Sequence, residues 1–135
     1  MPSPADVGDR SGRHAADFAV IEQRLDEHTT VISVEGELDL SSAPQLKWRL
    51  VDALEQGRNA IVVDLAGVTF MDSTALGVLV GVRRGLDRGA RLGIVCTDAN
   101  VLNVFRMSGL DAAFAIFRTR DGALAYARGE EAPRS

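Results

Sequence analysis

Cysteine and histidine are scarce in this chain of 135 residues, which contains one cysteine, Cys96, and two histidines, His14 and His28. A single cysteine cannot form an internal disulfide, so we expect a reducing, cytoplasmic location. One cysteine and two histidines are also too few ligands for a transition-metal site, and no H-E-x-x-H motif is present. The sequence therefore predicts no metal centre.

Long apolar runs are lacking too, since the longest wholly apolar stretch is the eight residues 75–82. The first seventeen residues hold no apolar segment of the kind found in signal peptides, so we expect neither a membrane span nor export. Acidic residues outnumber basic ones by 19 to 15, which gives a net charge of -4. Because this charge repels phosphate backbones and anionic lipids, neither nucleic acid nor a membrane is an expected partner.

The motifs of several common enzyme classes are missing as well. There is no G-x-S-x-G, no G-x-x-x-x-G-K-[ST] and no G-x-G-x-x-G, so the sequence favours neither a serine hydrolase nor a nucleotide-binding protein. The serine most like a nucleophile is Ser73, and both histidines lie far upstream of it. We therefore predict no catalytic residue and no cofactor.

What the chain does contain is the composition of one folded domain. Apolar residues make up 46% and charged residues 25% of it, close to globular averages, and its length is too short for two independent cores. Residues 1–17 and 128–135 are polar and lack a periodic apolar pattern, so we interpret them as a flexible N-terminal tail and a C-terminal tail. The folded domain is predicted over residues 18–127.

The hydrophobic pattern predicts an α/β fold. Two strands joined by a hairpin turn at residues 26–28 come first, and strands then alternate with helices, which requires a mixed β-sheet with helices packed against it. The run 60–65 is β-branched and apolar, as in a parallel strand buried on both faces, and Ala66-Gly67 is the predicted turn after it. The expected strands are 19–21, 30–37, 60–65, 91–96 and 115–117, and the expected helices begin near 42, 72, 100 and 121.

Two details of the helices carry further expectations. Residues 42–45 have the S-x-x-Q form of a capping box at the start of the first helix, where Trp48 is either a surface residue or a partly buried rim residue. Gly77 and Gly81 lie inside the second helix, where glycine is unfavourable, and close packing of that helix on the sheet is the simplest explanation.

Ser73 stands where a buried strand has ended and a helix begins. Free backbone amides and the positive end of the helix dipole point toward such a position, so a phosphoryl group could be carried there without unfolding the domain. The simpler interpretation is that Asp72 or Ser73 only caps the helix. Position alone leaves both readings open.

Three segments together resemble the STAS-domain anti-sigma factor antagonists of bacteria. The central pattern D-L-x-x-V-x-x-[MI]-D-S-[ST]-[AG]-[LV]-G is the most specific of them, and the order of the three matches. The resemblance covers residues 18 to 127. The segments are Gly36-Glu37-Leu38-Asp39, residues 62–77, and Ser108-Gly109-Leu110 before Phe114.

The resemblance implies a phosphorylation switch. In such proteins the serine of the D-S-[ST] motif, here Ser73, is phosphorylated by a cognate anti-sigma factor, a serine kinase of the GHKL type. The unmodified antagonist binds that kinase and frees the sigma factor, and a PPM-type phosphatase restores the unmodified form. Asp39 matches the family's aspartate near the phosphoacceptor and the partner surface, or is a turn residue leading into Ser41-Ser42. Asp72 is a cap or a neighbour that helps orient the serine and sense its charge, and Thr74 is expected mainly to satisfy backbone groups locally. Together, Asp39, Asp72, Ser73 and Thr74 are the predicted partner-binding residues.

Two alternatives stay open. The domain could serve a lipid-transport or other signalling assembly that does not use the Ser73 switch. It could also be a small enzyme built on the same serine, although no base is evident. Either way, the fold predicted is a single STAS domain.

Overall fold

The computed structural model describes residues 18–87 and 89–130 and contains one five-stranded sheet in the order β1-β2-β3-β4-β5. β1 runs antiparallel to β2, and β2, β3, β4 and β5 are parallel to one another. The predicted α/β fold with a mixed sheet and an opening hairpin is therefore confirmed. The strands are β1 (Ala19–Arg24), β2 (Thr29–Leu38), β3 (Ala60–Met71), β4 (Arg91–Val95) and β5 (Ala115–Phe117).

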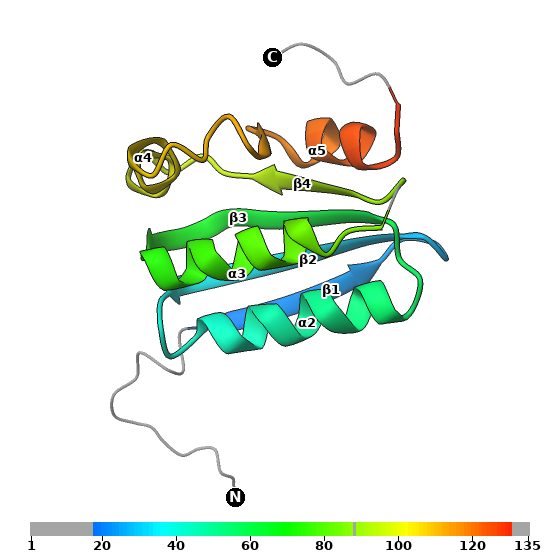
Figure 1. The fold of residues 1–135 in the computed structure, drawn as a ribbon, viewed down its shortest axis with the longest axis horizontal. Coiled ribbons are helices and arrows are strands. Elements are labelled where there is room, and N and C mark those ends of the chain that lie inside the picture. The colour runs from blue at the N-terminus through cyan, green and yellow to red at the C-terminus, as the bar shows by residue number, and fades with distance from the viewer. Residues whose placement is uncertain (1–17, 88, 131–135) are drawn as a thin grey trace, which may run out of the picture.

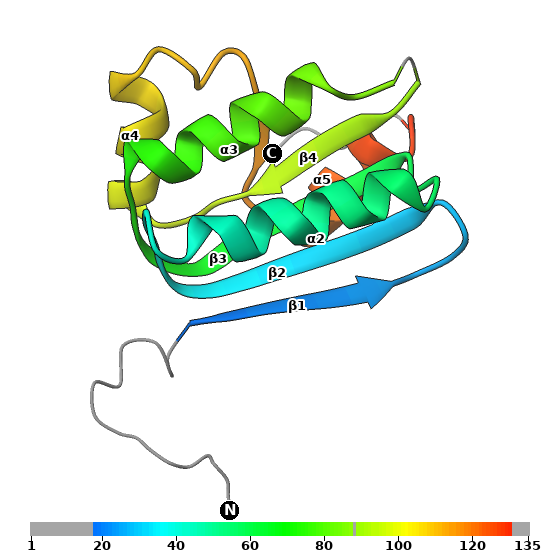
Figure 2. The same ribbon diagram turned by 60° about the horizontal axis from the view of Figure 1, so that its bottom comes forward.

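Helices cover both faces of this sheet (Figures 1 and 2). The helices α2 (Ala43–Glu55) and α3 (Ser73–Arg84) lie side by side over one face, and α5 (Arg120–Ala127) lies on the other. Since side chains alternate along a strand, neighbouring residues serve different cores. Ile32 and Val63 pack under α2 and α3, whereas Val31 and Val62 pack against α5. This explains why the run 60–65 is apolar throughout.

The order of elements matches the sequence prediction, and α4 (Ala99–Met107) is the remaining helix. The domain limits 18–127 stay a prediction, and residues 1–17 and 131–135 of the two predicted tails lie outside the described residues, as does His14. Arg128, the first residue of the predicted C-terminal tail, pairs with Asp26 at 3.4 Å.

The predicted turn at Ala66-Gly67 is wrong, because β3 continues through both residues to Met71. The strand accommodates them by two shifts in its pairing with β2, one between Ser33 and Glu35 and one between Gly36 and Glu37. Gly67 fits this arrangement since a Cβ atom there would lie 2.9 Å from Cγ of Glu35. Because β3 continues to Met71, Ser73 lies just beyond the end of this strand.

The predicted capping box is also wrong. Ser42 is the N-cap residue of α2, but its side chain makes no capping hydrogen bond to that helix. Its hydroxyl instead donates to the carbonyl of Glu37 at 2.7 Å and accepts the amide of Asp39 at 2.9 Å. The serine holds the preceding loop rather than the helix.

Candidate functional site

Three aspartates follow the three neighbouring parallel strands at one edge of the sheet. Asp39 comes after β2, Asp72 after β3 and Asp98 after β4. The first two loops touch, because the amide of Asp72 donates to the carbonyl of Leu38 at 3.2 Å. Figure 2 shows α2, α3 and α4 meeting the strand ends at this same edge. Ser73 therefore lies on the edge where the carboxyl ends of parallel strands converge, as open α/β sheets generally present their sites.

Asp72 caps α3. Its backbone is extended, and its Oδ1 atom accepts the amides of Thr74 at 2.9 Å and Ala75 at 3.1 Å. The cap interpretation of Asp72 is thus what the geometry shows. It also changes the expectation of free amides around Ser73, because two of the first-turn donors are already taken by this carboxylate.

Ser73 is the first residue of α3, and its side chain is exposed to solvent. Thr74 is exposed beside it, and within residues 18–87 and 89–130 the Thr74 hydroxyl makes no hydrogen bond, so the expected local bond of that side chain is not found there. Both hydroxyls can be reached by another protein. Only Ser73 immediately follows the capping carboxylate.

Asp39 holds the loop between β2 and α2. Its Oδ1 atom accepts the Ser41 hydroxyl at 2.8 Å, the Ser41 amide at 3.0 Å and the Ser42 amide at 3.1 Å. The Ser41 hydroxyl bond, helped by the backbone amides, holds the pKa of Asp39 below the ordinary value of 3.8. The carboxylate is charged at neutral pH, and because its folded pKa is the lower one, its stabilising bonds are lost only as the pH falls below about 4.

Asp98 was not singled out by the sequence, although its signal was present. Like Asp72, it precedes a helix, and its Oδ1 atom accepts the amides of Asn100 and Val101 at 2.8 and 3.1 Å. Each of the three aspartates thus satisfies backbone donors next to it. No group of three metal-ligating side chains is found in the described part of the chain.

Gly77 and Gly81 do not pack against the sheet, so that expectation is wrong. Both are exposed, and a Cβ atom at either one would have no neighbour within 4 Å. They line a groove between α2 and α3, which begins at Thr74 next to Ser73. Trp48 lies on the outer surface of α2 and is 70% exposed, so it is a surface residue.

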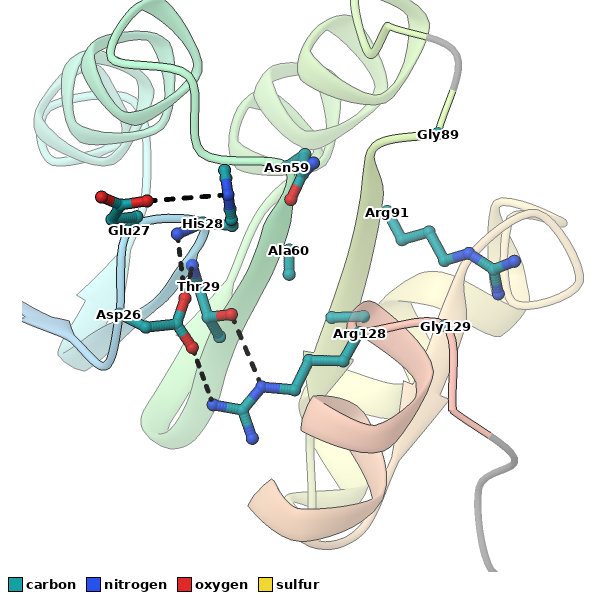
Figure 3. Close-up of a pocket in the computed structure, with 11 residues that line it drawn as sticks. Asp26, Glu27, His28, Thr29, Asn59, Ala60, Gly89, Arg91, Arg128 and Gly129 are labelled. Carbon is teal, nitrogen blue, oxygen red and sulfur yellow. Dashed lines mark hydrogen bonds and ion pairs between the residues drawn. The ribbon is translucent and has the colours of Figure 1, made fainter.

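A second cavity lies at the opposite edge, where β2, β3 and β4 begin (Figure 3). Four of its polar side chains form two pairs, Arg128 with Asp26 at 3.4 Å and His28 with Glu27 at 4.0 Å, and the Arg91 guanidinium lies over the Tyr126 ring. His28 is thus separated from Ser73 by the length of the strands and does not serve that serine as a base. The cavity is not part of the Ser73 site.

No helix of the described residues is long and apolar enough to cross a membrane. The chain is 30% identical over 103 residues to the anti-sigma-B factor antagonist of Bacillus subtilis, an alignment that covers 76% of this chain and 94% of that one.

Among solved structures, an anti-sigma factor antagonist from Mycobacterium paratuberculosis superposes with a TM-score of 0.77 and 28% identity, over 82% of this chain and 94% of that one. The antagonist SpoIIAA in its unphosphorylated form has a TM-score of 0.71 and 27% identity, and the alignment covers 84% of this chain and 99% of that one. A structure of the Bacillus SpoIIAA in the phosphorylated form has a TM-score of 0.63 and 25% identity, and the alignment covers 82% of this chain and 100% of that one.

This chain has the mixed α/β fold of these structures. The STAS domain model matches residues 20–123, which include every strand from β2 to β5 and the whole edge with its three aspartates. The chain belongs to the STAS domain family.

Proposed function

We propose that this protein is an anti-sigma factor antagonist switched by phosphorylation of Ser73. In its unmodified form it binds a cognate anti-sigma factor, a serine kinase of the GHKL type, and the sigma factor is released. The observation that carries the proposal is an exposed serine at the start of α3, in a chain that covers 94% of an anti-sigma factor antagonist. That a related antagonist has been solved in a phosphorylated form supports the switch.

The chemistry asks little of the antagonist itself. The Oγ atom of Ser73 attacks the γ-phosphorus of ATP, the bond between the β- and γ-phosphates breaks, ADP leaves, and the hydroxyl proton passes to a base of the kinase. Positioning and charge stabilisation by the kinase and its Mg²⁺ supply the catalysis. A PPM-type phosphatase reverses the modification by hydrolysis, which returns the hydroxyl and releases inorganic phosphate.

The test is phosphate mapping. Each GHKL-type anti-sigma factor of the source genome is purified and incubated with the protein, ATP and Mg²⁺, and the product is examined by tandem mass spectrometry. We expect one phosphate, on Ser73. Thr74→Ala should be modified normally, and Ser73→Ala should take no phosphate and remain competent to bind. A phosphate on Thr74 or Ser108 with Ser73 unmodified would contradict the assignment.

Asp39 belongs to the proposed docking surface, and its charge can be separated from its role in the loop. Asp39→Asn keeps an oxygen that can accept the Ser41 and Ser42 amides, so its melting temperature should stay near that of the wild type. Loss of the charge should weaken binding of the anti-sigma factor by about tenfold, or about 1.4 kcal/mol.

Asp39→Ala is the matched comparison, since it removes the acceptor as well. It should lower both the melting temperature and the affinity. If Asp39→Asn binds like the wild type while Asp39→Ala binds weakly, Asp39 acts only by holding the loop.

A further inference from the structure

The groove between α2 and α3 has a mainly apolar lining and reaches the Ser73 edge. Its volume is about 670 Å³, and Leu54, Val78 and Val82 are apolar side chains that line it. Thr74 lines its first end, directly beside Ser73. A protein that covers Ser73 and extends along the side of α3 that faces α2 therefore enters this groove. The other lining residues are Lys47, Val51, Glu55, Gly77, Gly81 and Gly85.

The α3 wall of the groove is bare backbone at Gly77 and Gly81. A Cβ atom at either position would meet no atom within 4 Å, so the fold itself does not require glycine there. Glycine inside a helix lowers its stability, and here that cost is not balanced by any close approach within the described residues. The missing side chains leave space for an external surface to approach the α3 backbone.

Charges at the two ends of the groove indicate what could fill it. Lys47 lies toward the Ser73 end and Glu55 eight residues later along α2, about 12 Å away. Both side chains are exposed, and neither has an ion-pair partner within 4 Å among residues 18–87 and 89–130.

The two helices run in the same direction, so their dipoles also make the two ends of the groove electrostatically different. α2 and α3 both follow parallel strands and both begin at the Ser73 edge, so their positive dipole ends lie together there. An occupant with a carboxylate near Lys47 and a basic side chain near Glu55 would complement the charges, and a helix running antiparallel to α2 and α3 would complement the dipoles.

We propose that this groove binds an amphipathic helix of the anti-sigma factor, antiparallel to α2 and α3. This inference rests on the function proposed above and adds a second contact area to the Ser73 edge. Apolar side chains at i, i+4 and i+7 of the partner helix lie over Gly77 and Gly81, between Val51 and Val78. The helix holds the kinase against the antagonist while its nucleotide faces Ser73.

Filling the groove tests the proposal. Gly81→Leu places a branched side chain in the open space on α3, and Gln45→Leu adds the same side chain to α2 outside the groove lining. Affinity for the anti-sigma factor that phosphorylates Ser73 is measured by calorimetry with ADP and Mg²⁺ present. We expect Gly81→Leu to bind at least tenfold more weakly, and Gln45→Leu to bind like the wild type. Melting temperatures establish that both variants are folded.

A second variant tests the same contact without blocking it. Cys96 is buried, and burial raises the pKa of its thiol to about 11, so it reacts slowly with maleimides. A cysteine introduced by Gly81→Cys is then the one reactive thiol of residues 18–87 and 89–130. The partner should slow its alkylation at least tenfold.

The outcomes separate the two proposals. If the wild type binds the kinase but Gly81→Leu binds equally well and the Gly81→Cys thiol is unprotected, the groove proposal is overturned and the Ser73 switch stands. If no GHKL-type anti-sigma factor binds the wild type, both fall. If sedimentation shows a self-association that Gly81→Leu abolishes, the groove accepts a second copy of this chain and the partner-helix proposal is overturned.

Discussion

The form phosphorylated at Ser73 is expected to bind the anti-sigma factor at least 100-fold more weakly than the unmodified form, a loss of about 3 kcal/mol. A phosphoserine adds about 1.5 to 2 negative charges at neutral pH. The carboxylate of Asp72 already occupies the Thr74 and Ala75 amides, so the new phosphate lies beside a negative charge instead of replacing it. Asp39 and Asp98 are on the same edge. An interface that closes over this edge must desolvate like charges together, which is costly.

Isothermal titration of both forms against the same kinase measures this loss. Ser73→Asp carries one charge on a shorter side chain and should reproduce only part of it. The amide chemical shifts of the two forms should differ near Ser73, Asp72 and Asp39 and agree elsewhere. Shift changes across the whole sheet would mean that the domain rearranges, and would contradict a mechanism in which the phosphate acts only on its surroundings.

Asp72→Ala is expected to lower the free energy of unfolding by about 2 kcal/mol, the upper end for the loss of a helix N-cap. The upper end applies because this carboxylate accepts two amides and because α3 is packed into the core through Ala75, Leu76 and Leu79. Urea denaturation monitored through the fluorescence of the one tryptophan, Trp48, measures the change. A drop in melting temperature of about 8 °C should accompany it.

Asp72→Ser provides the matched control, since serine is an equally good N-cap residue without charge. It should recover most of the stability lost in Asp72→Ala. Equal stability of Asp72→Ala and the wild type would mean that the cap contributes nothing. In the phosphorylated protein, Asp72→Ser should also regain part of the lost affinity, since one of the like charges is gone.

The order of the elements and the position of Ser73 could be predicted from sequence, because local signals set both. The apolar run 60–65 lies between two cores, and Asp72 precedes a helix in a way typical of caps. The proposed role of Ser73 did not follow from its position, because an aspartate or serine at a helix start is common for local reasons. It depended on the family resemblance.

The errors arose where tertiary contacts override local patterns. Gly77 and Gly81 look like packing residues, and only the placement of α2 beside α3 shows that they border an open groove. Ser42 has the sequence of a capping box, but the neighbouring Asp39 and Glu37 backbone groups take its hydroxyl. Ala66-Gly67 reads as a turn because glycine ends many strands, whereas here pairing with β2 continues past it.

The two register shifts of β3 make its length critical to the proposed switch. Buried residues of β3 facing α2 and α3 occur at 61, 63, 65, 68 and 71, so the spacing changes from two residues to three after 65 and stays at three up to Met71, which Asp72 follows. Removing one residue between Asp64 and Met71 would turn Met71 away from the core or draw Ser73 back along the sheet. In this stretch the side chains of Ala66, Thr69 and Phe70 are exposed. Substitutions at these three positions should therefore be tolerated, while single insertions and deletions in the stretch should not.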